Sequence, residues 1–259
     1  MRRGIRRRVG TPIAAAVAAL GLIGCGGASA ASPQQVADQL TQNDAALRSA
    51  IDAWRAAQDP PATPPPADVL AQAAFLQDRV DFLADHANLA AQVIPLLDGA
   101  LRSEITHLFA AKRDLLRLSA QSTHRKLKLG SRPPLAELVG DYQDASRRLG
   151  IGAHYLAAIH LVETKFGRVK NNSVAGAQGP MQFIPSTWKI YGHGGDIQDP
   201  HDAILGAARL LRANGAPARY GPALRAYNPS GLYVDAVSHY AKLIATNPYA
   251  IYFLYSWEP

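Results

Sequence analysis

The chain has 259 residues, 48% of them hydrophobic, which is enough to bury the core of one catalytic domain together with an accessory region. Its net charge of +7 is misleading, because five arginines lie within the first eight residues. Without them, 22 basic residues remain against 20 acidic ones, a balance of +2. This near-neutral balance argues against a basic nucleic-acid-binding protein, so we expect no nucleic acid partner.

Residues 1–31 have the pattern of a secretory signal. The arginine cluster is followed by an apolar segment, 13–23, which is too short to cross a membrane. The run LIGC is similar to a bacterial lipobox and ends at Cys25, the only cysteine, whereas the run ASA ending at Ala30 fits signal peptidase cleavage. We favour an exported lipoprotein anchored through Cys25 at the outer face of the cytoplasmic membrane. Secretion after cleavage at Ala30 is the alternative.

The segment after the signal predicts helices joined by a proline-rich linker. Residues 32–57 have an apolar stripe at helical spacing, with Ser32 as the N-cap and Pro33 as the first residue. The run DPPATPPP, which ends at residue 66, predicts a stiff, extended spacer. Residues 67–119 predict two or three helices, which belong to an accessory region 67–130. Pro95 is expected to start or kink one of them.

The second half of the chain also predicts helices. Residues 135–149 form an amphipathic pattern that Gly150 ends, and residues 151–163 are apolar nearly all round, which is typical of a buried helix. Asp199 and Pro200 are typical of a helix start. Only short pieces such as 251–255 suggest a strand, within an aromatic C-terminal stretch expected to pack on the domain or, alternatively, to contact sugars. We therefore predict a mainly α fold.

Glu163 is the candidate catalytic residue, at the inner end of the apolar helix. A carboxylate walled by apolar groups loses hydration, so its pKa rises toward the value that suits a general acid at neutral pH. The alternative is a structural glutamate that caps the helix or pairs with Lys165 or Arg168. His160 lies on the same helix face, but no second histidine or cysteine accompanies it, so we predict no metal site.

The residues after Glu163 have the composition of a sugar site. Small residues allow the backbone to approach a ligand, and amides next to flat apolar groups suit the two sides of a sugar ring. A phenol and an amide follow in the run AYN at 226–228. The candidate substrate-binding residues are Ser173, Gly179, Met181, Gln182, Phe183, Tyr227 and Asn228.

Three motifs carry a resemblance to a known family. The runs ET at 163–164, GPMQ at 179–182 and AYN at 226–228 resemble the ES, GLMQ and AYN motifs of the soluble SLT-type lytic transglycosylases, in the same order and at similar distances. Thr164 stands in place of the family's serine, and Pro180 in place of its leucine. The resemblance covers roughly residues 149–244, and residues 196–215 are also similar to the membrane-bound B-type enzymes. It implies a lysozyme-like catalytic domain at 131–259 preceded by a helical accessory region.

The same resemblance implies cleavage of the β-1,4 bond between N-acetylmuramic acid and N-acetylglucosamine in peptidoglycan, without water and without a cofactor. Glu163 would act first as acid and then as base, leaving 1,6-anhydro ends. Tyr227 would hydrogen-bond near Glu163 and orient it. Gln182 and Asn228 would hold the sugar, Met181 would pack beneath a ring, and Ser173 would contact the glutamate or the substrate.

Two other functions remain open from the sequence. One is a lysozyme-type hydrolase, for which Asp196 is the best spare acid to position water. The other is a non-catalytic glycan-binding lipoprotein, which the intact motif residues disfavour. In every case the expected partners are peptidoglycan strands and, through the lipid anchor, the membrane. The chain is expected to be a monomer.

Overall fold

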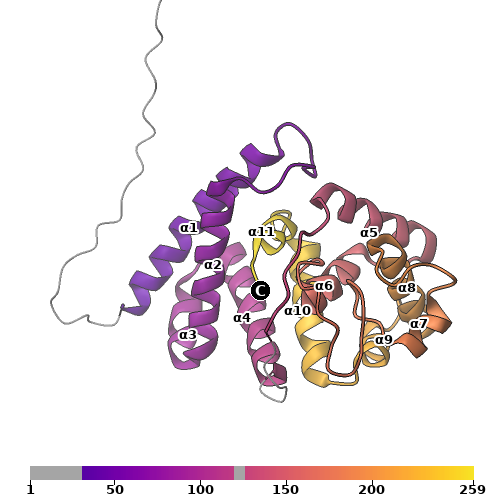
Figure 1. The fold of residues 1–259 in the computed structure, drawn as a ribbon. Helices are drawn as coiled ribbons and strands as arrows, with labels where there is room; N and C mark the ends of the chain where they lie inside the picture. Colours follow the sequence, from indigo (N-terminus) through magenta and orange to yellow (C-terminus); the bar gives the residue numbers. More distant parts are fainter. Residues whose placement is uncertain (1–30, 120–125) are drawn as a thin grey trace, which may run out of the picture. The chain divides into compact units, whose positions relative to one another are not determined.

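The computed structural model describes residues 31–119 and 126–259, and Ser32–Pro259 form one compact unit (Figure 1). Within the described residues the fold is mainly helical, as the sequence predicts, and β-structure is limited to two isolated bridges. The predicted lipobox and cleavage site lie outside the described residues. No helix in the described part of the chain combines the length and the apolar character needed to cross a membrane.

The predicted helices correspond closely to the observed ones. Ser32 caps α1 in a capping box with Gln35, and Pro33 is the first residue, as predicted. Gly150 ends α5 with a φ of 69°, and Asp199 caps α8 by accepting from the Asp202 amide. The helices are α1 (Pro33–Arg55), α2 (Ala67–Asp85), α3 (Ala87–Val93), the 3-10 helix η1 (Ile94–Leu96), α4 (Gly99–Ser119), α5 (Leu135–Leu149), α6 (Ala153–Thr164), α7 (Pro185–Tyr191), α8 (Pro200–Ala213), α9 (Tyr220–Tyr227), α10 (Gly231–Thr246) and α11 (Ala250–Ser256).

The predicted strand at 251–255 is wrong, because this segment belongs to helix α11. Aromatic and β-branched residues favour strands only where a sheet offers a pleated surface to pack against. Here the aromatic side chains of Tyr252, Phe253 and Tyr255 are all buried against neighbouring helices. The expected packing of this stretch on the domain is confirmed, since Trp257 is buried as well.

The proline-rich segment 59–66 is not the free spacer that its composition predicts. Pro61 is buried, and its carbonyl oxygen accepts a hydrogen bond from the Ala136 amide at 3.2 Å. The Tyr252 hydroxyl donates to the Asp59 carboxylate. Because prolines lack N–H groups but keep their carbonyls, such a segment is able to accept hydrogen bonds from helices on either side. The segment therefore connects α1 to α5 and α11 through these hydrogen bonds.

Helix α10 connects the two halves of the compact unit, since it packs along α4 and also against α6 (Figure 1). His107 of α4 and His239 of α10 contact each other through their Nδ1 atoms at 3.0 Å. The helices of the predicted accessory region thus pack directly on those of the predicted catalytic region. The boundary near residue 130 stays a prediction, and the core is continuous across it.

Candidate active site

Helix α6 delivers Glu163 to the site and then ends abruptly. The three residues after Thr164 all adopt left-handed backbone conformations, with φ values of 52° at Lys165, 57° at Phe166 and 78° at Gly167. Left-handed conformations cost free energy in residues other than glycine, so packing must hold them in place. The fully buried ring of Phe166 supplies such packing. The predicted break after Glu163 is confirmed.

Glu163 is held by one side chain, because the Tyr233 hydroxyl donates to its Oε1 at 2.7 Å. Burial raises the pKa of Glu163 to about 7, and the hydrogen bond from Tyr233 opposes this rise. No carboxylate among the described residues contributes to this pKa shift. Arg168 instead pairs with Glu258 at 3.1 Å, and the Lys165 ammonium lies 5.9 Å from the Trp257 ring centroid. Glu163 is therefore a carboxyl group with a raised pKa and no cationic partner among the described residues.

Thr164 connects the end of α6 to the GPMQ motif at 179–182 through a hydrogen bond. Its hydroxyl donates to the Pro180 carbonyl at 2.6 Å and accepts from the Gly167 amide at 3.0 Å. Serine carries the same hydroxyl, so both residues are able to make these two bonds. Thr164 is therefore able to make both bonds that a serine would make at this position.

The loop 178–183 has a shape that requires glycine. Gly179 has a φ of 74°, and a Cβ atom there would lie 1.9 Å from the Ile197 carbonyl oxygen. Gln178 and Phe183 close the loop with two reciprocal backbone hydrogen bonds of 2.9 Å. The predicted importance of Gly179 is thus explained by close backbone approach within the protein.

Tyr227 joins the third motif to this loop, close to Glu163, whereas the hydrogen bond to Glu163 itself comes from Tyr233. Its hydroxyl donates to the Met181 carbonyl at 2.6 Å. Its ring contacts that of Phe183 with centroids 5.7 Å apart and lies nearly parallel to that of Tyr233 at 6.3 Å. Glu163 raises the pKa of Tyr227 in addition to burial, so the two groups are neighbours. The three motifs therefore converge on one site.

The other predicted binding residues differ in what they offer to a ligand. Met181 is fully buried, so its side chain packs inside the protein beneath the loop and is not accessible to a ligand in this conformation. The Gln182 amide nitrogen donates to the carbonyl oxygens of Gly179 and Asn171 at 2.9 and 3.2 Å. This residue therefore shapes the loop through its side chain.

Ser173 and Asn228 also make local hydrogen bonds. The Ser173 hydroxyl accepts from the Ala177 amide at 2.9 Å, within its own loop. Asn228 ends α9 and accepts from the Ser230 amide at 3.1 Å through its Oδ1. Neither bond reaches Glu163, so any role in binding belongs to the remaining polar atoms of these side chains.

Tyr233 is the site residue that the sequence analysis missed. It lies near the start of α10, six residues after Tyr227, in a segment that is otherwise typical of an apolar core helix. Burial, followed by the charge of Glu163, raises the pKa of the Tyr233 phenol, so the phenol stays protonated and acts as a donor. The AYN run gives no sign of this second tyrosine, and only the start of the next helix brings it to Glu163.

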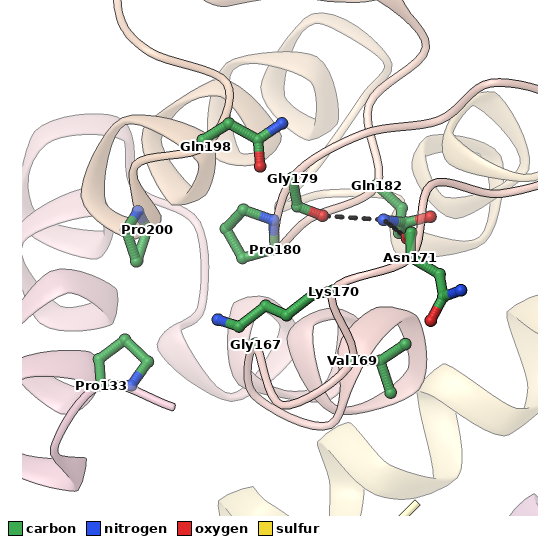
Figure 2. A pocket seen from close by; sticks show the side chains of 10 residues that line it. All are labelled: Pro133, Gly167, Val169, Lys170, Asn171, Gly179, Pro180, Gln182, Gln198 and Pro200. Carbon is green, nitrogen blue, oxygen red and sulfur yellow. Dashed lines mark hydrogen bonds between the residues drawn. The ribbon is translucent and has the colours of Figure 1, made fainter. Parts of the chain in front are cut away.

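A pocket of about 90 Å³ borders the motif loop (Figure 2). Gly179, Pro180 and Gln182 contribute one wall, and Lys170 and Gln198 lie on opposite sides. Glu163 is not among its lining residues.

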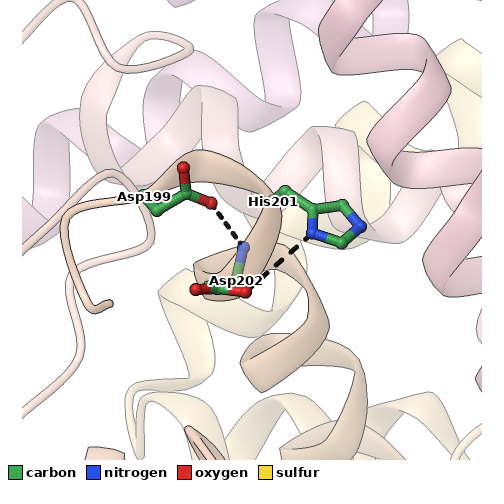
Figure 3. Close-up of side chains that lie close together, drawn as sticks. All are labelled: Asp199, His201 and Asp202. Carbon is green, nitrogen blue, oxygen red and sulfur yellow. Dashed lines mark hydrogen bonds and ion pairs between the residues drawn. The ribbon is translucent and has the colours of Figure 1, made fainter. Parts of the chain in front are cut away.

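Asp199, His201 and Asp202 bring three possible metal-ligand atoms within 4.8 Å of one another (Figure 3). Both aspartates are already used by the fold: Asp199 caps α8, and Asp202 accepts from the Asp196 amide at 2.9 Å. His201 also contacts Asp144 at 3.2 Å. The group is therefore sufficiently explained as the capped start of a helix.

No family model matches the chain, and neither the curated proteins nor the solved structures contain a match. The site is therefore interpreted from its own geometry and from the motif residues.

Proposed function

We propose that the protein is a lytic transglycosylase that cleaves the bond between N-acetylmuramic acid and N-acetylglucosamine in peptidoglycan. In this proposal, residues 131–259 have a lysozyme-like fold. The observation that carries the proposal is the isolation of Glu163, whose pKa is about 7 and whose only hydrogen-bond partner in the described structure is Tyr233. Ordinary glycosidases flank the bond with two carboxylates, and here one is available.

In the first step, protonated Glu163 donates its proton to the glycosidic oxygen. Tyr233 donates to Oε1, so Oε2 is the atom left to carry the proton toward the substrate. The bond between C1 and the leaving oxygen then breaks, and the substrate's own N-acetyl group stabilises C1. A pKa near 7 keeps a useful share of Glu163 protonated at neutral pH.

In the second step, the Glu163 carboxylate accepts the proton of the muramic C6 hydroxyl, whose oxygen attacks C1. The product is a 1,6-anhydro sugar, the enzyme returns to its protonated form, and no water is consumed. An attacking group within the same sugar has a far higher effective concentration than a separate molecule. Asp196, the acid that a hydrolase could use, accepts from the Gln198 amide at 2.8 Å, which is a local structural bond.

The test of this proposal is mass spectrometry of sacculi digested by the purified protein. The wild type should release fragments with 1,6-anhydromuramic ends, and the Glu163→Gln variant should release almost none. Fragments with reducing ends would identify a lysozyme-type hydrolase. Binding to sacculi without any release would identify a glycan-binding protein.

We also propose that the protein is exported and anchored to the membrane through lipidated Cys25. Lipoprotein processing supplies several acyl chains, which together hold a protein at a membrane far better than one chain does. Wild type expressed in a bacterial host should enter the detergent phase, and Cys25→Ser should stay in the aqueous phase. Equal release of both into the aqueous phase would favour cleavage after Ala30.

A further inference from the structure

The pocket beside the motif loop contains a cation with no partner. The Lys170 ammonium makes no hydrogen bond or ion pair with any described residue, although its aliphatic stem packs against Gly130. Figure 2 shows the ammonium pointing into the space bordered by Pro133, Pro180 and Pro200. None of the lining residues is acidic. A pocket with an unneutralised cation and no carboxylate is suited to an anion.

A second cation, Arg168, lies close to Lys170. Partial burial lowers the pKa of Lys170, and the charge of Arg168 lowers it further, while Arg168 itself pairs with Glu258 at 3.1 Å. Gln198 lies on the opposite side of the pocket and contributes a side-chain amide (Figure 2). Both side chains carry N–H donors, which are able to bind the oxygens of an anion.

A second polar group lies behind the pocket floor. His160 is fully buried and bonds the Tyr142 hydroxyl through Nδ1 at 2.7 Å, whereas its Nε2 has no hydrogen-bond partner among the described residues. That Nε2 would lie 3.6 Å from a Cβ atom added to Gly167, beside Pro133 and Pro180, which line the pocket. A buried polar atom without a partner is unusual, and this one lies beneath residues that line the pocket.

We propose that this pocket binds a carboxylate of the peptide that peptidoglycan carries on its muramic acid, with Lys170 as the counter-ion. The proposal rests on the proposed function, because it assigns the pocket to the same substrate. The loop 178–183 is the shared wall: Tyr227 holds it on the Glu163 side through the Met181 carbonyl, and its Pro180 and Gln182 face the pocket. A sugar bound at Glu163 carries its peptide across this wall.

The test measures binding in the Glu163→Gln background, so that turnover does not consume the ligand. The probes are a soluble muramyl peptide with a free carboxylate, the same molecule with that group converted to a carboxamide, and acetate. Calorimetry should show the carboxylate binding about five- to tenfold more tightly than the carboxamide, as expected for one charge-assisted contact. Lys170→Gln should abolish this preference, and Lys170→Arg should retain it.

The matched control is Lys242→Gln, which removes the same charge from an exposed position on α10 and should keep the preference. If Lys170→Gln still distinguishes carboxylate from carboxamide, the proposal is wrong. If acetate displaces the muramyl peptide at the peptide's own affinity, the pocket is a general anion site and the assignment to the peptide is overturned. A wild type that binds the probe through Lys170 but cleaves no peptidoglycan would refute the transglycosylase and leave the pocket assignment standing.

Discussion

Two glutamates in this protein have the same raised pKa of about 7, and burial is the main cause in both. Glu104 lies where α4 meets α1 and the end of α10, with Arg48 at 3.3 Å and the Asn247 amide as a second partner. Glu163 has a single neutral partner, the Tyr233 hydroxyl. A paired carboxylate ties elements of the fold together, whereas a carboxylate with one neutral donor keeps an oxygen available for a substrate. The number and charge of the partners, rather than the pKa, distinguish the two sites.

The largest difference between the two glutamates should appear in catalysis. Glu163→Gln keeps the shape of the side chain but removes the proton that is transferred, so cleavage of sacculi should fall on the order of 10²–10⁴-fold. Glu104→Gln should cleave at close to the wild-type rate, because Glu104 belongs to a structural contact. The measurement is the release of soluble muropeptides. Equal losses of activity in the two variants would show that Glu163 has no special role in catalysis.

The two variants should also differ in stability as the pH changes. Since the folded pKa of Glu163 is about 7 and its ordinary value is 4.5, the native state binds more protons than the unfolded state between these values. The stability contributed by this group is therefore present below pH 4.5 and is lost as the pH rises through 7. Glu163→Gln should gain about 1–3 kcal/mol relative to wild type between pH 4.5 and pH 8.

Glu104→Gln removes a similar proton-binding group, but it also leaves Arg48 without its buried partner. That loss should cost about 1–3 kcal/mol and offset the gain at high pH. Urea unfolding of both variants at pH 5 and pH 8 measures the difference. If the free energy of unfolding of Glu163→Gln exceeds that of wild type by less at pH 8 than at pH 5, the burial of Glu163 is contradicted.

A smaller effect should sharpen the role of Tyr233. Because catalysis requires protonated Glu163, activity should fall as the pH rises through about 7. The hydrogen bond from Tyr233 lowers the pKa of Glu163, so Tyr233→Phe should move this falling limb to higher pH. Glu104→Gln should leave the limb in place. A limb that stays unchanged in Tyr233→Phe, in rates measured from pH 5 to pH 9, would mean that this tyrosine does not act on the acid.

The part of the site that the sequence predicts is the part encoded by contiguous residues. Glu163 follows an apolar helical run, and Gly179 belongs to a loop of small residues, so local patterns alone predict both as candidates. The partner of Glu163 was not, because Tyr233 approaches it from another helix and has the sequence context of a core aromatic. Hydrogen bonds between distant segments depend on tertiary packing, which no local pattern specifies.

The fold shows the same limit. Helix starts with a capping residue and a proline, such as Ser32 and Asp199, were predicted correctly because their signals are local. The segment 251–255 was assigned to a strand because its aromatic residues favour strands where a sheet is present. The proline-rich segment 59–66 was assigned to a spacer because its contacts with α5 and α11 come from residues far away in the chain.

The most direct measurement is digestion of peptidoglycan in water enriched in heavy oxygen. With a single carboxylate at the site and the muramic C6 hydroxyl as the attacking group, the new ends should be 1,6-anhydromuramic acid without label. An inverting hydrolase needs a second carboxylate about 6.5–9.5 Å from the first to activate water. Unlabelled anhydro ends are the result that we predict. Reducing ends that carry heavy oxygen would contradict the transglycosylase and direct attention to Asp196 or Asp199 as the missing base.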